Sequence, residues 1–240
     1  MKQRGFTVIE LMVTLAIAAV LLGLGIASFN TMMETSRARA VAESIMSGLR
    51  MARAEAIKRN VPIRFHLVTT LDDTCVTDNA GSLWVVTQAD NAAHGVIQNH
   101  CGSAAYTPPD QPDICNPDVP ACSDTVLTNC RGLPVATNLN PGTCSDDPLI
   151  AYKSDDIKYQ TITVSGTSTI GGVAAAAVTF TPLGRMTANL VGGTSMDQID
   201  IQSSDTDAKK WRIQIAQGSG SLRLCDPDAT VAATSAQACR

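Results

Sequence analysis

The strongest constraint on this chain is a run of nineteen residues, 11–29, that is mainly apolar and contains no charged side chain. As an α-helix this run is about 28 Å long, close to the roughly 30 Å hydrocarbon core of a membrane. The run begins almost at the N-terminus, after a basic segment, residues 1–5, that contains Lys2 and Arg4. We therefore expect residues 6–29 to form a transmembrane helix, with the basic segment on the cytoplasmic side.

The basic segment differs from an ordinary secretory signal peptide. In a secretory signal the cleavage site follows the apolar run, whereas here Gly5 lies before it. Glu10 is equally unusual, because a carboxylate next to a membrane span costs a few kcal/mol unless it has a partner. The segment Gly5-Phe6-Thr7-Val8-Ile9-Glu10-Leu11 resembles the class III signal of type IV pilins and type II secretion pseudopilins.

This resemblance implies a processing step and a role in assembly. In the family, a prepilin peptidase cuts after the glycine and methylates the new N-terminal residue, so cleavage is expected after Gly5 and N-methylation on Phe6. The glutamate, Glu10 in this chain, pairs in the filament with the amino terminus of a neighbouring subunit. Two charges that meet in an apolar core fix the axial register, because a misplaced neighbour leaves both unpaired. A plain membrane anchor with a chance glutamate is the alternative.

Residues 30–60 are predicted to continue the same helix as an amphipathic stalk, since no proline occurs before Pro62. Apolar residues recur at three- and four-residue steps, namely Val41, Ile45, Leu49, Ala52 and Ala56, while Arg37, Glu43, Arg50 and Arg53 occupy polar positions. This spacing predicts one apolar stripe along the helix. We expect the stripe to pack on the body of the protein.

The body, residues 61–240, is predicted to be rich in β-strands. Runs of β-branched and aromatic residues predict strands over 63–68, 83–88, 159–164, 177–181, 198–202, 211–216 and 222–225. A sheet with one face on the amphipathic helix buries both apolar surfaces. The expected fold class is therefore α+β, a pilin-like fold in which a long N-terminal helix packs on an antiparallel sheet.

Eight cysteines and only three histidines favour disulfides over metal binding, because no CxxC pair is present. Five of the cysteines lie in an insertion, about residues 89–148, that is rich in Asn, Asp, Pro, Gly and Thr. Eight cysteines allow on the order of a hundred pairings. The one pairing that we predict is Cys225 with Cys239. The others would be linked among themselves in an order left open: Cys75, Cys101, Cys115, Cys122, Cys130 and Cys144.

Three further segments narrow the resemblance: residues 52–59, residues 180–185, and residues 222–227 with Cys239. Together they resemble the GspH/FimT group, which contains minor pilins and minor pseudopilin H of type II secretion. The resemblance implies a minor pilin that takes part in pilus initiation at the filament tip, and the cysteine-closed C-terminal loop favours a pilus over a secretion pseudopilus.

The resemblance also implies a location and partners. The chain is expected as a single-pass protein of the bacterial inner membrane with its C-terminal domain in the periplasm, and then in a pilus or pseudopilus. Expected partners are prepilin peptidase, other minor and major pilins, the inner-membrane assembly platform and membrane lipid.

DNA is a possible partner that the charge distribution disfavours. After residue 60 the chain has ten basic and eighteen acidic residues, a net charge of -8, which repels a polyanion. The best candidate basic cluster is Lys209, Lys210, Arg212, Arg223 and Arg240. A tip adhesin or a DNA-uptake receptor of natural transformation remains a second alternative, since some FimT proteins bind DNA through a basic C-terminal region.

No enzymatic motif is present, since the chain lacks G-x-S-x-G, a phosphate-binding GxxxxGK[ST] loop and H-E-x-x-H. His94, His100 and Cys101 have no second ligand pair at a spacing suited to a metal. We therefore expect no catalytic residue, no metal and no cofactor.

Overall fold

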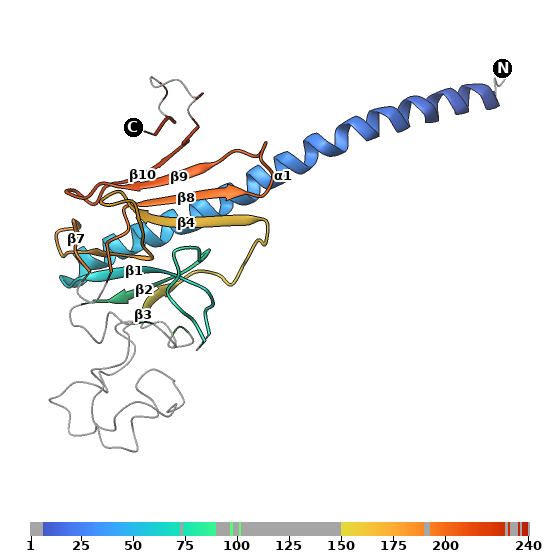
Figure 1. Ribbon diagram of the computed structural model, residues 1–240. Helices are drawn as coiled ribbons and strands as arrows, with labels where there is room; N and C mark the ends of the chain where they lie inside the picture. Colours follow the sequence, from blue (N-terminus) through green and yellow to red (C-terminus); the bar gives the residue numbers. More distant parts are fainter. Residues whose placement is uncertain are drawn as a thin grey trace, which may run out of the picture.

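The computed structural model describes residues 7–72, 74–89, 97, 101, 150–189, 193–228, 230, 235 and 237–239. Over these residues the chain forms one long helix, α1 (Val8–Arg59), and ten short strands in two antiparallel sheets. Figure 1 shows that the sheets surround only the C-terminal half of α1, while its N-terminal half projects away from them.

Helix α1 is closed at both ends by local signals. At its start the Glu10 backbone N–H donates to Thr7 Oγ1 (3.3 Å) and the Thr7 N–H donates to Glu10 Oε2 (3.5 Å), forming a capping box. At its end Asn60 adopts a left-handed conformation with φ 56°, and Pro62 cannot continue the helix. The single uninterrupted helix expected from the sequence is confirmed over Val8–Arg59.

In the part of the chain that the structure describes, no helical stretch combines the length and the apolarity needed to cross a membrane. The assignment of residues 6–29 as a transmembrane helix stays a prediction.

The strands form two sheets of five strands each. Sheet A contains, in spatial order, β3 (Ile150–Lys153), β2 (Leu83–Gln88), β1 (Ile63–Val68), β6 (Ala177–Phe180) and β7 (Met186–Thr187). Sheet B contains β10 (Leu222–Cys225), β9 (Trp211–Ile215), β8 (Gln198–Ser203), β4 (Ile162–Ser168) and β5 (Val173–Ala174). The expectation of one sheet on the helix is therefore corrected to two.

The predicted strands differ from the observed ones mainly where apolar alternation is weak. Strand β4 begins three residues later than expected and extends to Ser168, because its buried positions after Val164 are the small residues Gly166 and Ser168. Strands β5 and β7 are only two residues long, and β3 has four residues, so none of them was predicted. Short strands carry too little pattern to recognise.

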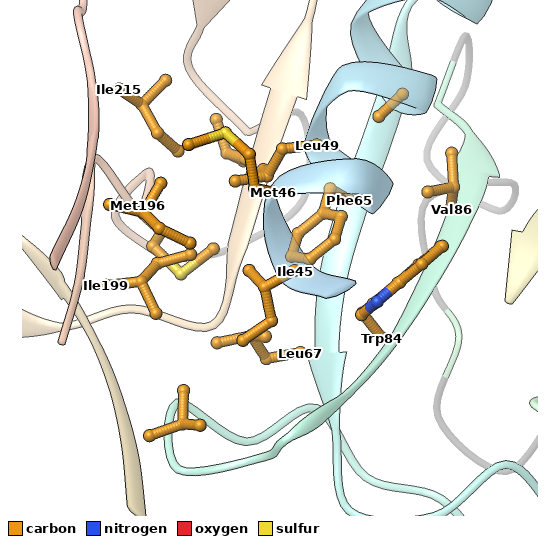
Figure 2. Close-up of a cluster of buried hydrophobic side chains, with 14 of the residues drawn as sticks. Ile45, Met46, Leu49, Phe65, Leu67, Trp84, Val86, Met196, Ile199 and Ile215 are labelled. Carbon is orange, nitrogen blue, oxygen red and sulfur yellow. The ribbon is translucent and has the colours of Figure 1, made fainter. Parts of the chain in front are cut away.

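The core lies where the apolar stripe of α1 meets the inner faces of both sheets. Ile45 and Leu49 are fully buried, and the other stripe residues are at most 5% exposed, as the spacing predicts. They form one cluster with Phe65 of sheet A and Ile199 of sheet B (Figure 2). Complete burial of such a side chain contributes about 1.5–3 kcal/mol, so this cluster holds the two sheets to the helix.

Two disulfides are present among the described residues. Cys225 is bonded to Cys239, the pair expected from the sequence, and Cys75 is bonded to Cys101. The second disulfide lies in a smaller apolar cluster with Leu83 of β2. The remaining cysteines lie outside the described residues: Cys115, Cys122, Cys130 and Cys144.

Strand β1 is buried on both faces, which its alternating sequence does not indicate. His66 is only 2% exposed, and its Nε2 lies 3.1 Å from Thr87 Oγ1. Arg64 Nε donates to Thr179 Oγ1 (2.9 Å) beside it. Burial, together with the charge of Arg64, lowers the pKa of His66 to about 3.

This buried histidine predicts a loss of stability in acid. The pKa of His66 is depressed in the folded state, so its contribution is complete above pH 6.5 and is lost as the pH falls from 6.5 towards 3. The loss is about 1.4 kcal/mol for each pH unit in that window. The melting temperature of the full-length chain in detergent should therefore fall more steeply with decreasing pH than the melting temperature of the His66→Gln variant. Parallel pH profiles would contradict the burial of a neutral imidazole.

Close packing of Gly48 against two aromatic rings gives a second prediction. A Cβ added there would lie 2.6 Å from Trp84 Cδ2 and 2.8 Å from Phe65 Cε2, in the buried core. Gly48→Val should lower the free energy of unfolding by about 1–3 kcal/mol, because the core cannot absorb the added volume. Denaturant titration measures this, with Ala54→Val at an exposed site of the same helix as the control. The packing argument fails if the two variants are equally destabilised.

Candidate assembly helix and C-terminal hollow

The projecting half of α1 presents an apolar surface to solvent. Among the side chains that the structure describes in this segment, nine large apolar ones are more than half exposed: Val8, Ile9, Leu11, Met12, Val13, Leu15, Ile17, Val20 and Phe29. Soluble monomers rarely expose a contiguous apolar surface of this extent, so such a surface marks an interaction site. We refer to residues 8–29 of α1 as the arm.

Glu10 carries the single charge of the arm. Its side chain is exposed and has only the local capping partner Thr7 within the described chain. The carboxylate is therefore accessible to a group from another molecule. Gly5 and Phe6 lie outside the described residues, so cleavage after Gly5 and methylation of Phe6 stay predictions.

The arm leaves the body at a set of polar contacts between α1 and sheet B. The Thr31 hydroxyl donates to Asp205 Oδ2 (2.9 Å), and the Ser203 hydroxyl donates to Glu34 Oε2 (2.8 Å). Hydrogen bonds from Thr161 and Ser203 lower the pKa of Glu34 below its ordinary value. These contacts fix the direction in which the arm projects.

The predicted basic cluster is only partly brought together. Lys209, Lys210 and Arg212 line a hollow of about 910 Å³ against sheet B. Arg223 is not part of this lining; its Nη2 donates to the Ala238 carbonyl (2.7 Å). Arg240 lies outside the described residues.

The cations of the hollow are balanced by carboxylates that the sequence argument overlooked. Arg212 makes a bidentate pair with Asp200, with Nε to Oδ1 at 2.5 Å and Nη2 to Oδ2 at 3.1 Å. Lys209 Nζ lies 3.1 Å from Asp226 Oδ2 and 4.7 Å from the centre of the Trp211 ring. The hollow is also lined by Asp207 and Asp228. Its three cations therefore face four carboxylates, which does not suit a phosphate backbone.

The pairing of Asp200 with Arg212 follows from strand register. The two residues lie directly opposite each other in the β8–β9 pair, where opposite charges attract. A prediction of that hairpin with its register would have found the pair. The pairing of Asp226 with Lys209 leaves no comparable signal in the sequence, because Asp226 lies after the end of β10 and not opposite Lys209 in a strand pair.

No metal site is found in the described ranges, where no group of three or more His, Cys, Asp or Glu side chains could hold an ion. Cys101 is in a disulfide, and His94 and His100 lie outside those ranges.

Comparison with known proteins gives two family matches. The prokaryotic N-terminal methylation motif matches residues 1–26, and the family described as type II transport protein GspH matches residues 41–220. Among curated proteins, none matches the chain. Among solved structures, the crystal structure of the Pseudomonas aeruginosa (strain PAO1) type IV minor pilin FimU matches with 16% identity and a TM-score of 0.38, over 82% of this chain and 92% of that chain.

The GspH match covers more than half of the chain and includes the C-terminal part of α1 and most of both sheets. The protein therefore belongs to the family described as type II transport protein GspH, and a prokaryotic N-terminal methylation motif precedes that domain.

Proposed function

We propose that this protein is a minor pilin, a structural subunit of a type IV pilus that takes part in pilus initiation and assembly at the filament tip. The observation that carries the proposal is the arm: an exposed apolar helix with one carboxylate, most of which lies within the match to an N-terminal methylation motif. Such a surface needs an apolar environment. A membrane supplies that environment before assembly, and the core of a helical filament supplies it afterwards.

The proposed sequence of events begins in the inner membrane. Prepilin peptidase cleaves after Gly5 and methylates Phe6, while residues 6–29 lie in the lipid and the body lies in the periplasm. The inner-membrane assembly platform then moves the subunit into a filament with other minor and major pilins. There Glu10 exchanges its local capping partner for the amino terminus of a neighbouring subunit. Because a charge left alone in an apolar core is costly, this pair sets the axial register.

Minor pseudopilin H of a type II secretion system is the alternative, and the name of the matched family favours it. The disulfide-closed segment between Cys225 and Cys239 favours the pilus, because such a loop is typical of the pilus branch. The balanced charges of the hollow argue against a DNA-uptake receptor. We assign the protein no enzymatic activity.

The experiment that tests the proposal is intact-mass and N-terminal analysis of the chain from native membranes and from sheared surface filaments. The expected species begins at a methylated Phe6 and is present in both fractions. Retention of Met1 in cells with an active prepilin peptidase would show a plain membrane anchor instead. Presence in membranes but never in sheared filaments would favour the pseudopilin.

Removal of the Glu10 charge should block assembly without blocking membrane insertion. We expect Glu10→Ala and Glu10→Gln to lower the amount of the chain in sheared filaments at least about tenfold, because the neighbouring amino terminus is left unpaired. The glutamine variant separates the charge from the helix cap, since an amide still accepts a hydrogen bond from Thr7. Glu43→Ala is the control, because its exposed pair with Arg39 contributes little. Normal incorporation of Glu10→Gln would refute the pairing.

A further inference from the structure

The two ends of the body carry opposite charges without ionic partners, and we propose that they join this chain head to tail to a second copy of itself. The distal pole, at the C-terminal end of α1, contains Arg50, Arg53, Ile57, Leu183 and Arg185. The proximal pole, where the arm leaves the body, contains Asp155, Asp156, Ile157, Asp205 and Asp207. This inference rests on the proposed function and deepens it, because it names the axial neighbour of the subunit.

At the distal pole, the end of α1 meets two turns. Arg53 Nε donates to the Gly184 carbonyl (2.9 Å) in the β6–β7 turn, and its Nη2 donates to the Ser219 carbonyl (3.3 Å) in the β9–β10 turn. Arg185 Nε donates to the Gly218 carbonyl (2.8 Å). These contacts hold both guanidinium groups in place. The acceptors are neutral, so they do not balance the charges.

Arg50 extends this basic surface, since it lies one turn before Arg53 on the same face of α1. None of the distal arginines forms an ion pair with a carboxylate in the described ranges. Two carboxylates near the distal pole do not offset this charge. Glu55 already pairs with Arg59. Asp197 is only 3% exposed and accepts hydrogen bonds from a threonine and a glutamine. The distal pole therefore presents positive charge to solvent.

Apolar side chains lie beside these arginines. Leu183 is 77% exposed and Ile57 is 54% exposed. A hollow of about 660 Å³, lined by Pro182, Leu183, Met186 and other residues of the same turns, adjoins them. An exposed apolar surface beside arginines is typical of a protein interface. A nucleic acid would use the arginines and leave Leu183 and Ile57 in water.

The proximal pole has the opposite charge. Asp155 and Asp156 are exposed in the connection between β3 and β4, and Asp207 is exposed in the turn between β8 and β9. Asp205 accepts hydrogen bonds from Thr31 and from a backbone N–H, but it has no ion pair among the described residues. Ile157, beside the aspartates, is 57% exposed.

Three lysines lie near the same pole. Lys209 and Lys210 already have carboxylates of their own, because Lys209 pairs with Asp226 and Lys210 acts on Asp228. Lys158 donates to the carbonyl of Thr69. Hydrogen bonds from neighbouring threonines, and then the charge of Lys158, lower the pKa of Asp72. These lysines therefore do not neutralise the four aspartates of the proximal pole. This end of the body therefore presents negative charge next to one exposed apolar residue, as the distal pole presents positive charge next to two.

The two poles lie at opposite ends of the same helix segment. Glu34, at the proximal contacts, and Arg53 are about 28 Å apart along the axis of α1. A second copy that places its proximal pole on the distal pole of the first has its arm beside the first body. The arm, residues 8–29, is about 33 Å long and so can span that body. A repeated head-to-tail contact of this kind produces an open stack rather than a closed dimer.

The test uses the full-length chain in detergent and measures self-association by sedimentation at low and high salt. The distal variant is Arg50→Glu with Arg185→Glu, at two exposed sites, and the proximal variant is Asp155→Lys with Asp156→Lys. Each should weaken association at low salt at least about tenfold, because like charges then face each other. A mixture of the two variants should restore it, since the distal end of one is then complementary to the proximal end of the other.

The control makes the same change in total charge as the distal variant at four exposed sites outside both poles, by Ala40→Glu, Ser165→Glu, Ala174→Glu and Ala188→Glu. The proposal is overturned if this control weakens association as much as the distal variant, or if neither pole variant changes it. It is also overturned if the distal variant loses binding to a labelled DNA duplex while self-association is unchanged, which would identify a nucleic-acid site. Filament incorporation of the wild-type chain is measured separately, because it tests the proposed function. If the wild-type chain enters filaments but the pole variants do not weaken self-association, the axial contact is refuted and the proposed function is not.

Discussion

Burial of one face of α1 between two antiparallel sheets is the interaction on which the rest of the structure depends. Ile45 and Leu49 lie in one cluster with residues of both sheets, and α1 contacts β1 and β2 on one side and β8 and β9 on the other. Because the strands form two separate sheets, the helix is the element that both share. The direction of the arm and the separation of the two poles follow from this packing.

The sequence predicted those parts of the fold whose signals are local and periodic. The stripe that contains Ile45 and Leu49 repeats with the period of a helix, and β1 begins directly after the proline that ends α1. The division into two sheets could not be predicted, because it depends on which strands pair over long distances. Small residues at the buried positions Gly166 and Ser168 hid the second half of β4.

In the candidate site, too, local signals could be predicted from the sequence and long-range partners could not. The processing signal around Gly5 and Glu10 is contiguous, so the sequence reveals it, and the N-terminal methylation match covers it. The charge balance of the basic cluster could not be predicted because its counter-charges come from elsewhere: Asp200 lies across the β8–β9 pair, and Asp226 follows β10. The charge of Arg53 at the distal pole was equally hidden, because its partners are carbonyl groups of two distant turns.

The arrangement of α1 has a mechanical consequence. Figure 1 shows the strands of both sheets lying roughly along the body half of the helix, which itself continues into the arm. Traction on the arm would therefore enter the body as shear along the helix, against the contacts of Ile45 and Leu49 and the polar contacts of Thr31 and Glu34 together. A load shared among many contacts at once resists rupture better than one that opens them in turn. The buried stripe that folds the protein is thus also its anchor against force.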